Sequence, residues 1–164
     1  MDIALYQPDQ PPNTGTLLRL GACMDVPVHI IEPCGFPFSP KAIKRYAMDY
    51  ADHVQMNHHL DWANFQNWHE MSQRRLVLLT TQSSTVYSDF TFRPNDILMV
   101  GSESAGVPQD VHSYCEARVT VPMKTEVRSL NIAVALSMVL GEALRQTDML
   151  PKTTKTTTTT KTTD

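Results

Sequence analysis

The chain has 164 residues, 41% of them hydrophobic and 19% charged, with a formal net charge of −3 at pH 7. That length is enough for one domain with a proper hydrophobic core. The acidic balance argues against a protein that binds nucleic acid through an overall positive charge, so any RNA contact must come from local basic clusters.

Apolar and amphipathic segments alternate along the chain, and the first is a short apolar strand at residues 3–6. Further strands are expected at residues 28–31, 54–56, 76–81, 97–101 and 117–123, of which the segment at 54–56 is the weakest. Helices are expected to start behind Asn13 or Thr14, Ser39, Asp61 and Pro108.

Strands that alternate with helices and form continuous apolar runs predict an α/β fold, with a mostly parallel sheet and helices on both faces. In such sheets, ligands bind beyond the carboxyl ends of the strands. Three of the expected strand ends have unusual sequences, at residues 79–81, 101–103 and 121–123. We therefore expect a ligand site at this edge.

The last helix follows the sequence Arg-Ser-Leu-Asn at residues 128–131 and is almost wholly apolar over residues 132–140. Ser129 is the expected N-cap. Asn131 is a poor helix former, so its place in the first turn suggests a function. A helix that is apolar on nearly every face is expected to be buried on all sides. The helix either holds a ligand at its N-terminus or is a capped core helix at a subunit interface.

The last 13 residues, 152–164, are nine Thr, three Lys and one Asp. Such a low-complexity segment has nothing to bury and is predicted to be a disordered tail. The remaining domain, residues 1–151, has 11 Lys and Arg against 16 Asp and Glu, a net charge of −5.

Cys23, Cys34 and Cys115 are odd in number and widely spaced, so neither a disulfide framework nor a zinc site is indicated. A reducing cytoplasm fits such cysteines best. The first residues lack the basic region and apolar core of a signal peptide. The longest apolar run, interrupted by Ser137 and Gly141, is too short to span a membrane.

Several common catalytic and nucleotide-binding motifs do not occur. The chain has no GxGxxG and no GxSxG, and Gly106 is followed by Val-Pro, which does not support a phosphate-binding P-loop. Without an HExxH sequence, metal catalysis is not supported, and the pair His58-His59 is expected to be solvated.

Three segments stand out, at residues 11–22, 98–108 and 121–135. They resemble the signature motifs of the SPOUT methyltransferases, and more narrowly those of the small one-domain tRNA (cytidine/uridine-34-2′-O)-methyltransferases. Residues 29–36, the pair Asp49-Tyr50 and residues 78–81 also match that subfamily.

The resemblance implies an α/β sheet with a C-terminal trefoil knot, a homodimer, and S-adenosylmethionine as the methyl donor, with no metal required. It places the first and last helices across the dimer interface. The cofactor residues that it implies are Leu79, Gly101, Val121, Met123, Ser129 and Leu130. The catalytic residues that it implies are Arg19, Asn13, Glu103, Ser129 and Asn131.

Arg19 is implied to be catalytic, but the pKa of an arginine argues against a free neutral base. We expect Arg19 to hold the adjacent phosphate and to stabilise the developing 2′-oxyanion, and in a dimer it can act on the partner's site. Asn131 is expected to face the acceptor ribose and Ser129 the cofactor. Asn13 is expected to orient Arg19 or the sugar, or only to cap a helix. Glu103 is expected to pair with a basic residue or touch the substrate, or to be a solvated carboxylate.

The expected substrate is a tRNA anticodon loop, because single-stranded loops expose their nucleotides to a protein without an appended RNA-binding domain. Some wobble methyltransferases have an Arg after the Glu of the second motif, where this chain has Ser104. The same transfer on another tRNA position or on ribosomal RNA, a non-catalytic RNA-binding dimer, and a generic nucleotide-binding module are the alternatives. Candidate RNA contacts are Lys41, Lys44, Arg45, Arg74, Arg75, Lys124 and Arg128.

Overall fold

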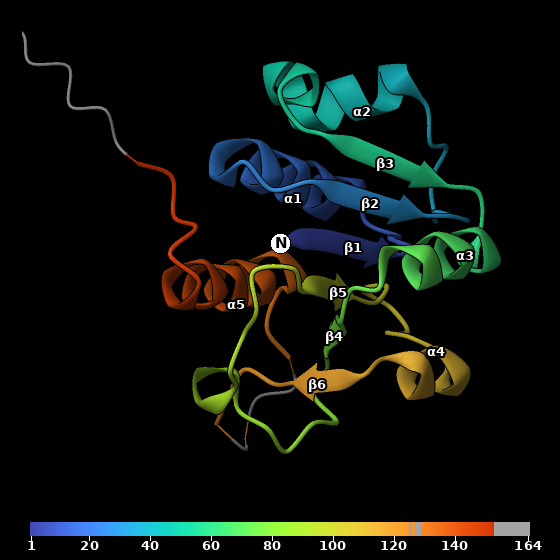
Figure 1. Ribbon diagram of the computed structural model, residues 1–164. Helices are drawn as coiled ribbons and strands as arrows, with labels where there is room; N and C mark the ends of the chain where they lie inside the picture. The colour runs from blue at the N-terminus through green and yellow to red at the C-terminus, as the bar shows by residue number, and fades with distance from the viewer. Residues whose placement is uncertain (125, 127–128, 153–164) are drawn as a thin grey trace, which may run out of the picture.

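A computed structural model of the protein describes residues 1–124, 126 and 129–152 (Figure 1). The predicted tail from residue 153 onward and Arg128 lie outside the described residues. Six parallel strands form one sheet in the order β3-β2-β1-β5-β4-β6, which confirms the predicted α/β class. The strands are β1 (Asp2–Tyr6), β2 (Val28–Ile31), β3 (Met56–His59), β4 (Leu76–Leu79), β5 (Ile97–Val100) and β6 (Ala117–Val119).

Helices cover both faces of the sheet (Figure 1). The α-helices are α1 (Pro11–Met24), α2 (Pro40–Ala47), α3 (Trp62–Ser72), α4 (Gln109–Tyr114) and α5 (Ile132–Gln146). Two short 3₁₀ helices are η1 (Met48–Asp52) and η2 (Tyr87–Asp89). Alternate residues of β1 point to opposite faces, so Ile3 and Leu5 pack in the core that contains α1, α2 and α5, and Ala4 packs in the core that contains α3 and α4.

Of the four helix starts predicted behind Asn13 or Thr14, Ser39, Asp61 and Pro108, three are confirmed and one is wrong. Helix α4 begins at Gln109, directly after Pro108. The side chains of Ser39 and Asp61 accept hydrogen bonds from backbone N–H groups at the starts of α2 and α3. The first helix starts earlier than predicted, at Pro11, and neither Asn13 nor Thr14 caps it. Proline suits a first helical turn because the missing N–H group would have no partner there.

The strand predicted at residues 54–56 is misplaced, since β3 covers Met56–His59. This strand lies at the edge of the sheet, where it pairs only with β2. An edge position tolerates polar residues such as Asn57 and His58. Because of these residues the strand is not a continuous apolar run, so the sequence pattern did not identify it.

The prediction that α5 is buried on all sides is also wrong for this single chain. One side of the helix packs in the core through Leu136, Val139 and Leu140. The other side exposes Val134 (48% exposed) and Met138 (41% exposed). These two residues are four positions apart and therefore share one face of the helix.

Three buried polar side chains on neighbouring strands, together with the partly buried Arg74 before β4, form a chain of contacts. The Nε2 atom of His59 lies 2.9 Å from Nδ1 of His29, and Nε2 of His29 lies 3.1 Å from Oδ2 of Asp2. The guanidinium of Arg74 donates to the same Asp2 oxygen. His59 is only 8% exposed, so the expectation of a solvated histidine pair is wrong for this residue.

The chain of contacts shifts two pKa values. Burial lowers the pKa of His59 to about 4, and the neighbouring His29 and His58 act in the same direction. Burial opposes ionisation of Asp2, but its hydrogen bonds to His29 and Arg74 prevail and lower its pKa to about 2.

No helix in the described part of the chain is long and apolar enough to cross a membrane.

The pKa of His59 predicts a loss of stability in mild acid. In the unfolded chain His59 takes up a proton near pH 6.5, whereas in the folded chain it stays neutral until about pH 4. The folded state is therefore favoured in full above pH 6.5, and the free energy of unfolding falls by up to about 3 kcal/mol as the pH drops to 4. Denaturant unfolding at several pH values measures the slope of the free energy of unfolding against pH for the wild type and for His59→Asn. The slope should shrink in His59→Asn and persist in the control His53→Asn, whose histidine is exposed. Equal slopes in the wild type and His59→Asn would contradict the assignment.

Candidate active site

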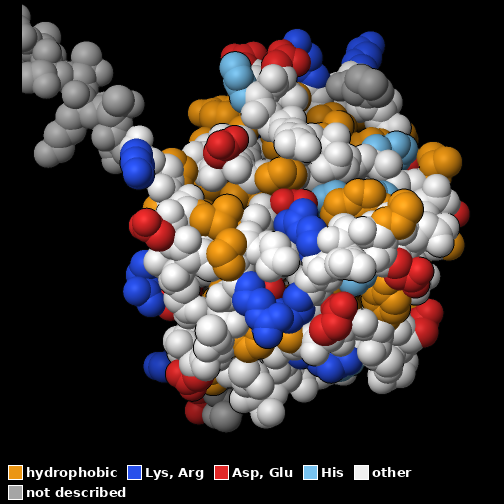
Figure 2. Space-filling model, in the orientation of Figure 1, with side chains coloured by type: hydrophobic (Ala, Val, Ile, Leu, Met, Phe, Trp, Pro, Cys, Tyr) orange, Lys and Arg blue, Asp and Glu red, His pale blue; other side chains and the backbone are white. Residues whose placement is uncertain are grey.

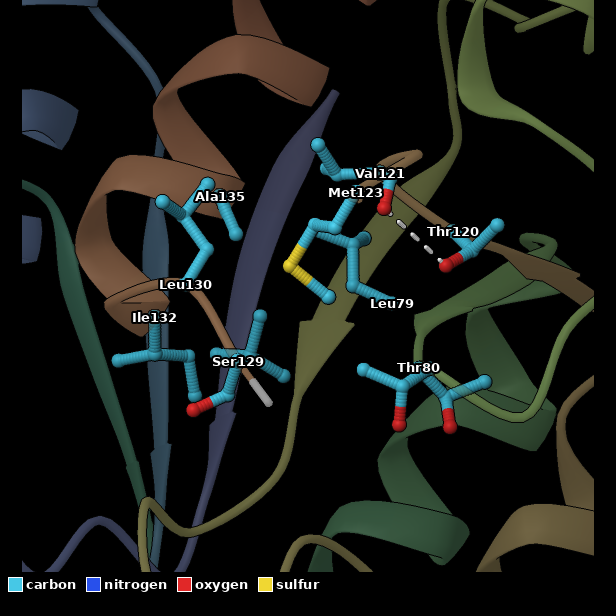
Figure 3. A pocket seen from close by; sticks show the side chains of 11 residues that line it. Leu79, Thr80, Thr120, Val121, Met123, Ser129, Leu130, Ile132 and Ala135 are labelled. Atoms are coloured by element: carbon cyan, nitrogen blue, oxygen red, sulfur yellow. Dashed lines mark hydrogen bonds between the residues drawn. The ribbon is translucent and has the colours of Figure 1, made fainter. Parts of the chain in front are cut away.

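A pocket lies where β4 and β5 end and α5 begins (Figure 3). Figure 3 shows the Met123 side chain extending into the space between Leu130 and Leu79. Five of the six residues predicted to bind the cofactor line this one pocket, and only Gly101 does not. The lining residues are Leu79, Thr80, Thr81, Val100, Thr120, Val121, Met123, Ser129, Leu130, Ile132 and Ala135.

The walls of the pocket are mostly apolar, and the polar side chains among the described lining residues are the hydroxyls of Thr80, Thr81, Thr120 and Ser129. None of these described residues carries a charge. Apolar walls with a few placed polar groups are typical of a site for a small organic ligand.

Gly101 directly follows β5, next to the pocket, and shapes the turn after the strand. Ser102 and Gly106 pair with each other, with N–H to O distances of 3.0 and 2.8 Å. A Cβ atom on Gly101 would lie 2.4 Å from the carbonyl carbon of Gly106. The family resemblance implies a cofactor role for Gly101, but in this structure the close approach that the glycine allows is that of the turn's own backbone.

Three of the predicted catalytic residues are joined by hydrogen bonds. Nδ2 of Asn131 donates to Oδ1 of Asn13 at 3.1 Å, and Nδ2 of Asn13 donates to Oε1 of Glu103 at 3.0 Å. Among the described residues, Glu103 accepts from the Asn13 amide and has no basic partner. The chain of contacts connects the loop after β5, the first turn of α1 and the start of α5.

The predicted N-cap of the last helix is wrong. Asn131 caps α5, and its Oδ1 atom accepts from the N–H groups of Ala133 (2.9 Å) and Val134 (3.3 Å). Asparagine and serine are both good N-caps, so the sequence alone does not separate them. Because Ser129 is not the cap, its side chain is left to line the pocket.

Asn131 stands between two hollows. Its neighbours Leu130 and Ile132 line the apolar pocket, whereas Asn131 itself lines a second, more open groove together with Asn13. The groove runs between α1 and α5 and is lined by Asn13, Thr16, Asn131, Ala133, Val134, Ser137 and Met138.

Arg19 is not among the residues that line either hollow. It is exposed on α1, and its guanidinium lies over the ring of Tyr50, 4.9 Å from the ring centre. A cation over an aromatic face is attracted by the electron-rich ring. Tyr50 belongs to η1, so this contact connects the first helix with the segment after α2.

Sequence reasoning missed Asp9, which lies in the loop after β1 and contacts the turn after β5. The signal was available, because the carboxyl end of β1 lies at the same edge of the sheet as the ends of β4 and β5. The loop's prolines indicated only a turn.

Two of the predicted RNA-contacting residues are used inside the fold. Arg74 binds Asp2, and Arg75 makes two hydrogen bonds to Asp96, at 2.7 and 2.8 Å. On the face shown in Figure 2, Lys and Arg side chains are interspersed with Asp and Glu. On α2, Lys44 forms an ion pair with Asp52. Lys41, Arg45 and Lys124 are exposed.

Within the described residues, no group of three or more His, Cys, Asp and Glu side chains is placed to hold a metal ion. The three cysteines are free thiols. Burial raises the pKa of both Cys34 and Cys115 to about 12, so neither is poised as a nucleophile.

The chain belongs to the SpoU rRNA Methylase family, whose profile matches residues 1–141. It is 55% identical over 150 residues to a tRNA (cytidine(34)-2′-O)-methyltransferase from Beijerinckia indica, with 92% of this chain and 94% of that protein covered.

Solved structures agree with the family. One that gives structural insights into the 2-OH methylation of C/U34 on tRNA is 34% identical, with a TM-score of 0.82, and covers 88% of this chain and 94% of that one. An SpoU methyltransferase from Streptomyces viridochromogenes, in complex with AdoMet, has a TM-score of 0.80. It is 22% identical and covers 89% of this chain and 57% of that one, so this likeness concerns the fold alone.

Substitutions at the start of α5 separate the two candidate caps. Asn131→Ala should lower the free energy of unfolding by about 1 kcal/mol, because two N–H groups lose their acceptor. Asn131→Asp keeps the acceptor and places a negative charge at the positive end of the helix, so it should stay closer to the wild type. Chemical denaturation measures all three proteins.

Ser129→Ala is the matched control, and it should change the free energy of unfolding by less than about 0.5 kcal/mol. A loss in Ser129→Ala as large as that in Asn131→Ala would return the cap to Ser129.

Proposed function

We propose that the protein transfers a methyl group from S-adenosylmethionine to the ribose 2′-oxygen of nucleotide 34 of tRNA. One observation carries the proposal: the three predicted motif segments meet beside one pocket whose described lining residues are uncharged, and the hydrogen bonds among Asn131, Asn13 and Glu103 join them. The tRNA (cytidine(34)-2′-O)-methyltransferase to which the chain is 55% identical supports the choice of substrate.

The pocket fits S-adenosylmethionine by the chemistry of its lining. When bound, this cofactor supplies an electrophilic methyl group on a positively charged sulfur. Apolar side chains such as Leu79, Leu130 and Ile132 exclude water, and the hydroxyls of Thr80 and Ser129 offer hydrogen bonds to polar edges. The uncharged side chains among the described lining residues neither repel the sulfonium nor hold it as a fixed ion pair. Gly101 lies at the edge of the pocket, and we propose that it shapes the pocket wall.

The acceptor ribose is placed at Asn131, between the pocket and the open groove. There the 2′-oxygen of the ribose faces the methyl donor across the first turn of α5. Positioning of the reacting groups then supplies much of the rate of transfer. Asn13 and Glu103 fix the orientation of the Asn131 amide. Neutralisation of charge between an oxyanion and a sulfonium is favoured where water is excluded.

Arg19 is assigned to the developing oxyanion and the neighbouring phosphate of the partner's site. Its position outside both hollows of its own chain supports a role across a dimer. Arginine keeps its charge and offers a fork of N–H donors to a phosphate. Proton removal from the 2′-hydroxyl is therefore not assigned to Arg19.

A homodimer built on α1 and α5 is part of the proposal. The exposed Val134 and Met138, together with Thr16, line the groove between these helices and would be covered by a second copy. The proposed trefoil knot is supported by the path of the chain. β6 pairs on the outer side of β4, and α5 then returns to pack against β5 and α1.

RNA contacts are assigned to the exposed Lys41, Arg45 and Lys124, doubled by the dimer. Each phosphate contact releases counterions, so the affinity for RNA should fall with added salt, and the small number of contacts predicts a shallow dependence. The three free thiols favour a reducing compartment such as the cytoplasm.

The family's name gives one second candidate, the same 2′-O-methyl transfer on ribosomal RNA. Methyl mapping separates the two substrates. The purified protein is incubated with cofactor and with tRNA or ribosomal RNA from a strain that lacks the gene, and 2′-O-methyl groups are located by mass spectrometry. A new methyl group at nucleotide 34 of tRNA is expected. Methylation of ribosomal RNA alone would move the substrate, and transfer to neither RNA would contradict the proposal.

Arg19→Ala should reduce methyl transfer by at least about 100-fold, because an oxyanion loses its stabilising cation. Binding of S-adenosylmethionine, measured by calorimetry, should change little. Equal loss of binding and transfer would contradict the catalytic role.

The dimer makes a sharper version of this test possible. Ala135→Phe fills the cofactor pocket and leaves Arg19 intact, whereas Arg19→Ala does the reverse. When the two chains are co-expressed, a mixed dimer should regain one working site. Activity no higher than in either variant alone would place Arg19 at the site of its own chain.

A further inference from the structure

Asp9 joins two loops at the carboxyl edge of the sheet. It lies between β1 and α1, and its partner is the turn after β5. Oδ2 of Asp9 accepts hydrogen bonds from the backbone N–H of Ser104, at 3.1 Å, and from the Ser104 hydroxyl. In return, the backbone N–H of Asp9 donates to Oε2 of Glu103 at 3.0 Å.

These contacts fix the direction of the Glu103 carboxylate. One of its oxygens is held by Asp9 and the other accepts from Asn13, 3.0 Å away. Asn13 in turn accepts from Asn131 at 3.1 Å. A displacement of the Asp9 loop would therefore pass through Glu103 and Asn13 to the start of α5.

The loop that bears Asp9 has little freedom to shift. The N–H of Gly35 donates to the carbonyl of Pro8 at 3.0 Å. A Cβ atom on Gly35 would lie 2.6 Å from Cβ of Asp9 and 2.8 Å from its Cα. Three segments, after β1, β2 and β5, are thus packed together around Asp9, with room there only for a glycine at position 35.

We propose that Asp9 is a positioning residue for methyl transfer, and that Ser104 is its partner. The pair locks the turn after β5 against the start of α1, so that Glu103 holds Asn13 and Asn131 in the orientation that the acceptor ribose needs. This inference rests on the proposed function of the site.

The protonation state of Asp9 agrees with this arrangement. Its hydrogen bonds, first of all that from the Ser104 side chain, lower the pKa of the carboxyl group below its ordinary value. Asp9 is therefore an ionised acceptor near neutral pH, and hydrogen bonds to an ionised acceptor are stronger than those between neutral groups.

Three variants test the proposal: Asp9→Asn, Ser104→Ala and the double variant. Each single change should lower kcat for methyl transfer to tRNA by about 10-fold to 100-fold, because small misplacements of reacting groups are costly. Calorimetry should show cofactor affinity within about twofold of the wild type. The double variant should be no slower than the slower single variant, since both changes remove the same contact.

A matched control exists at η2, where the exposed Ser88 hydroxyl donates to Oδ1 of Asp89 at 3.3 Å. Asp89→Asn and Ser88→Ala make the same chemical changes and should keep wild-type kcat. Chemical denaturation checks that Asp9→Asn and Ser104→Ala are folded under the assay conditions. Because Ser104 is exposed, its variant also covers the case in which Asp9→Asn fails to fold.

Wild-type kcat in the folded Asp9 or Ser104 variant would overturn the inference, as would losses that multiply in the double variant. A loss explained wholly by the unfolded fraction would overturn it too. If the wild-type protein itself transfers no methyl group to tRNA, the proposed function fails, and that result is distinct from all of these.

Discussion

The site depends on the chain of hydrogen bonds that runs from Glu103 through Asn13 to Asn131. Its members come from three places that are far apart in the sequence and that the parallel sheet brings to one edge. Asn131 also caps α5, so one amide both starts the helix and joins it to the other two segments. The apolar pocket is bounded by the residues on either side of this amide, and its shape therefore depends on where the amide is held.

Some of the basic side chains form ion pairs within the fold and are therefore not free to contact RNA. Arg74 and Arg75 neutralise the buried Asp2 and Asp96, which anchor the start of the sheet. They contribute little to a basic surface. A protein whose exposed cations lie in small clusters gains by dimerisation, because two copies of a small cluster can contact one RNA together. The exposed apolar face of α5 offers a place for such an association.

Much of the fold could be predicted, because continuous apolar runs such as residues 28–31 and 97–100 identify buried parallel strands. The pocket's walls were also predictable, since the motif segments stand at strand ends. What local sequence could not give is contact between distant residues. His59 looked solvated from the sequence. The register pairs it with Ile31, on the same face of the sheet as His29, and its Nε2 atom lies 2.9 Å from Nδ1 of His29.

The prediction of the N-cap of α5 was wrong for a different reason. Ser129 and Asn131 are both good caps, and only the path of the chain selects between them. Asp9 was missed because its loop was interpreted only as a turn. The end of β1 indicated the right edge of the sheet, but the partners of Asp9 lie more than 90 residues away along the chain. The exposed face of α5 could not be predicted either. A sequence that is apolar on all sides of a helix predicts that the helix is buried, but it does not say what covers each side.

The central claim is that this edge of the sheet delivers a methyl group to one ribose oxygen. The most direct measurement uses two tRNAs that differ only at nucleotide 34, one with its ordinary ribose and one with a 2′-deoxyribose. Transfer of radioactive methyl from S-adenosylmethionine is followed for both. The account predicts labelling of the first and none of the second above background. Equal labelling of both tRNAs would show that the acceptor is a base or another nucleotide, and would contradict the account.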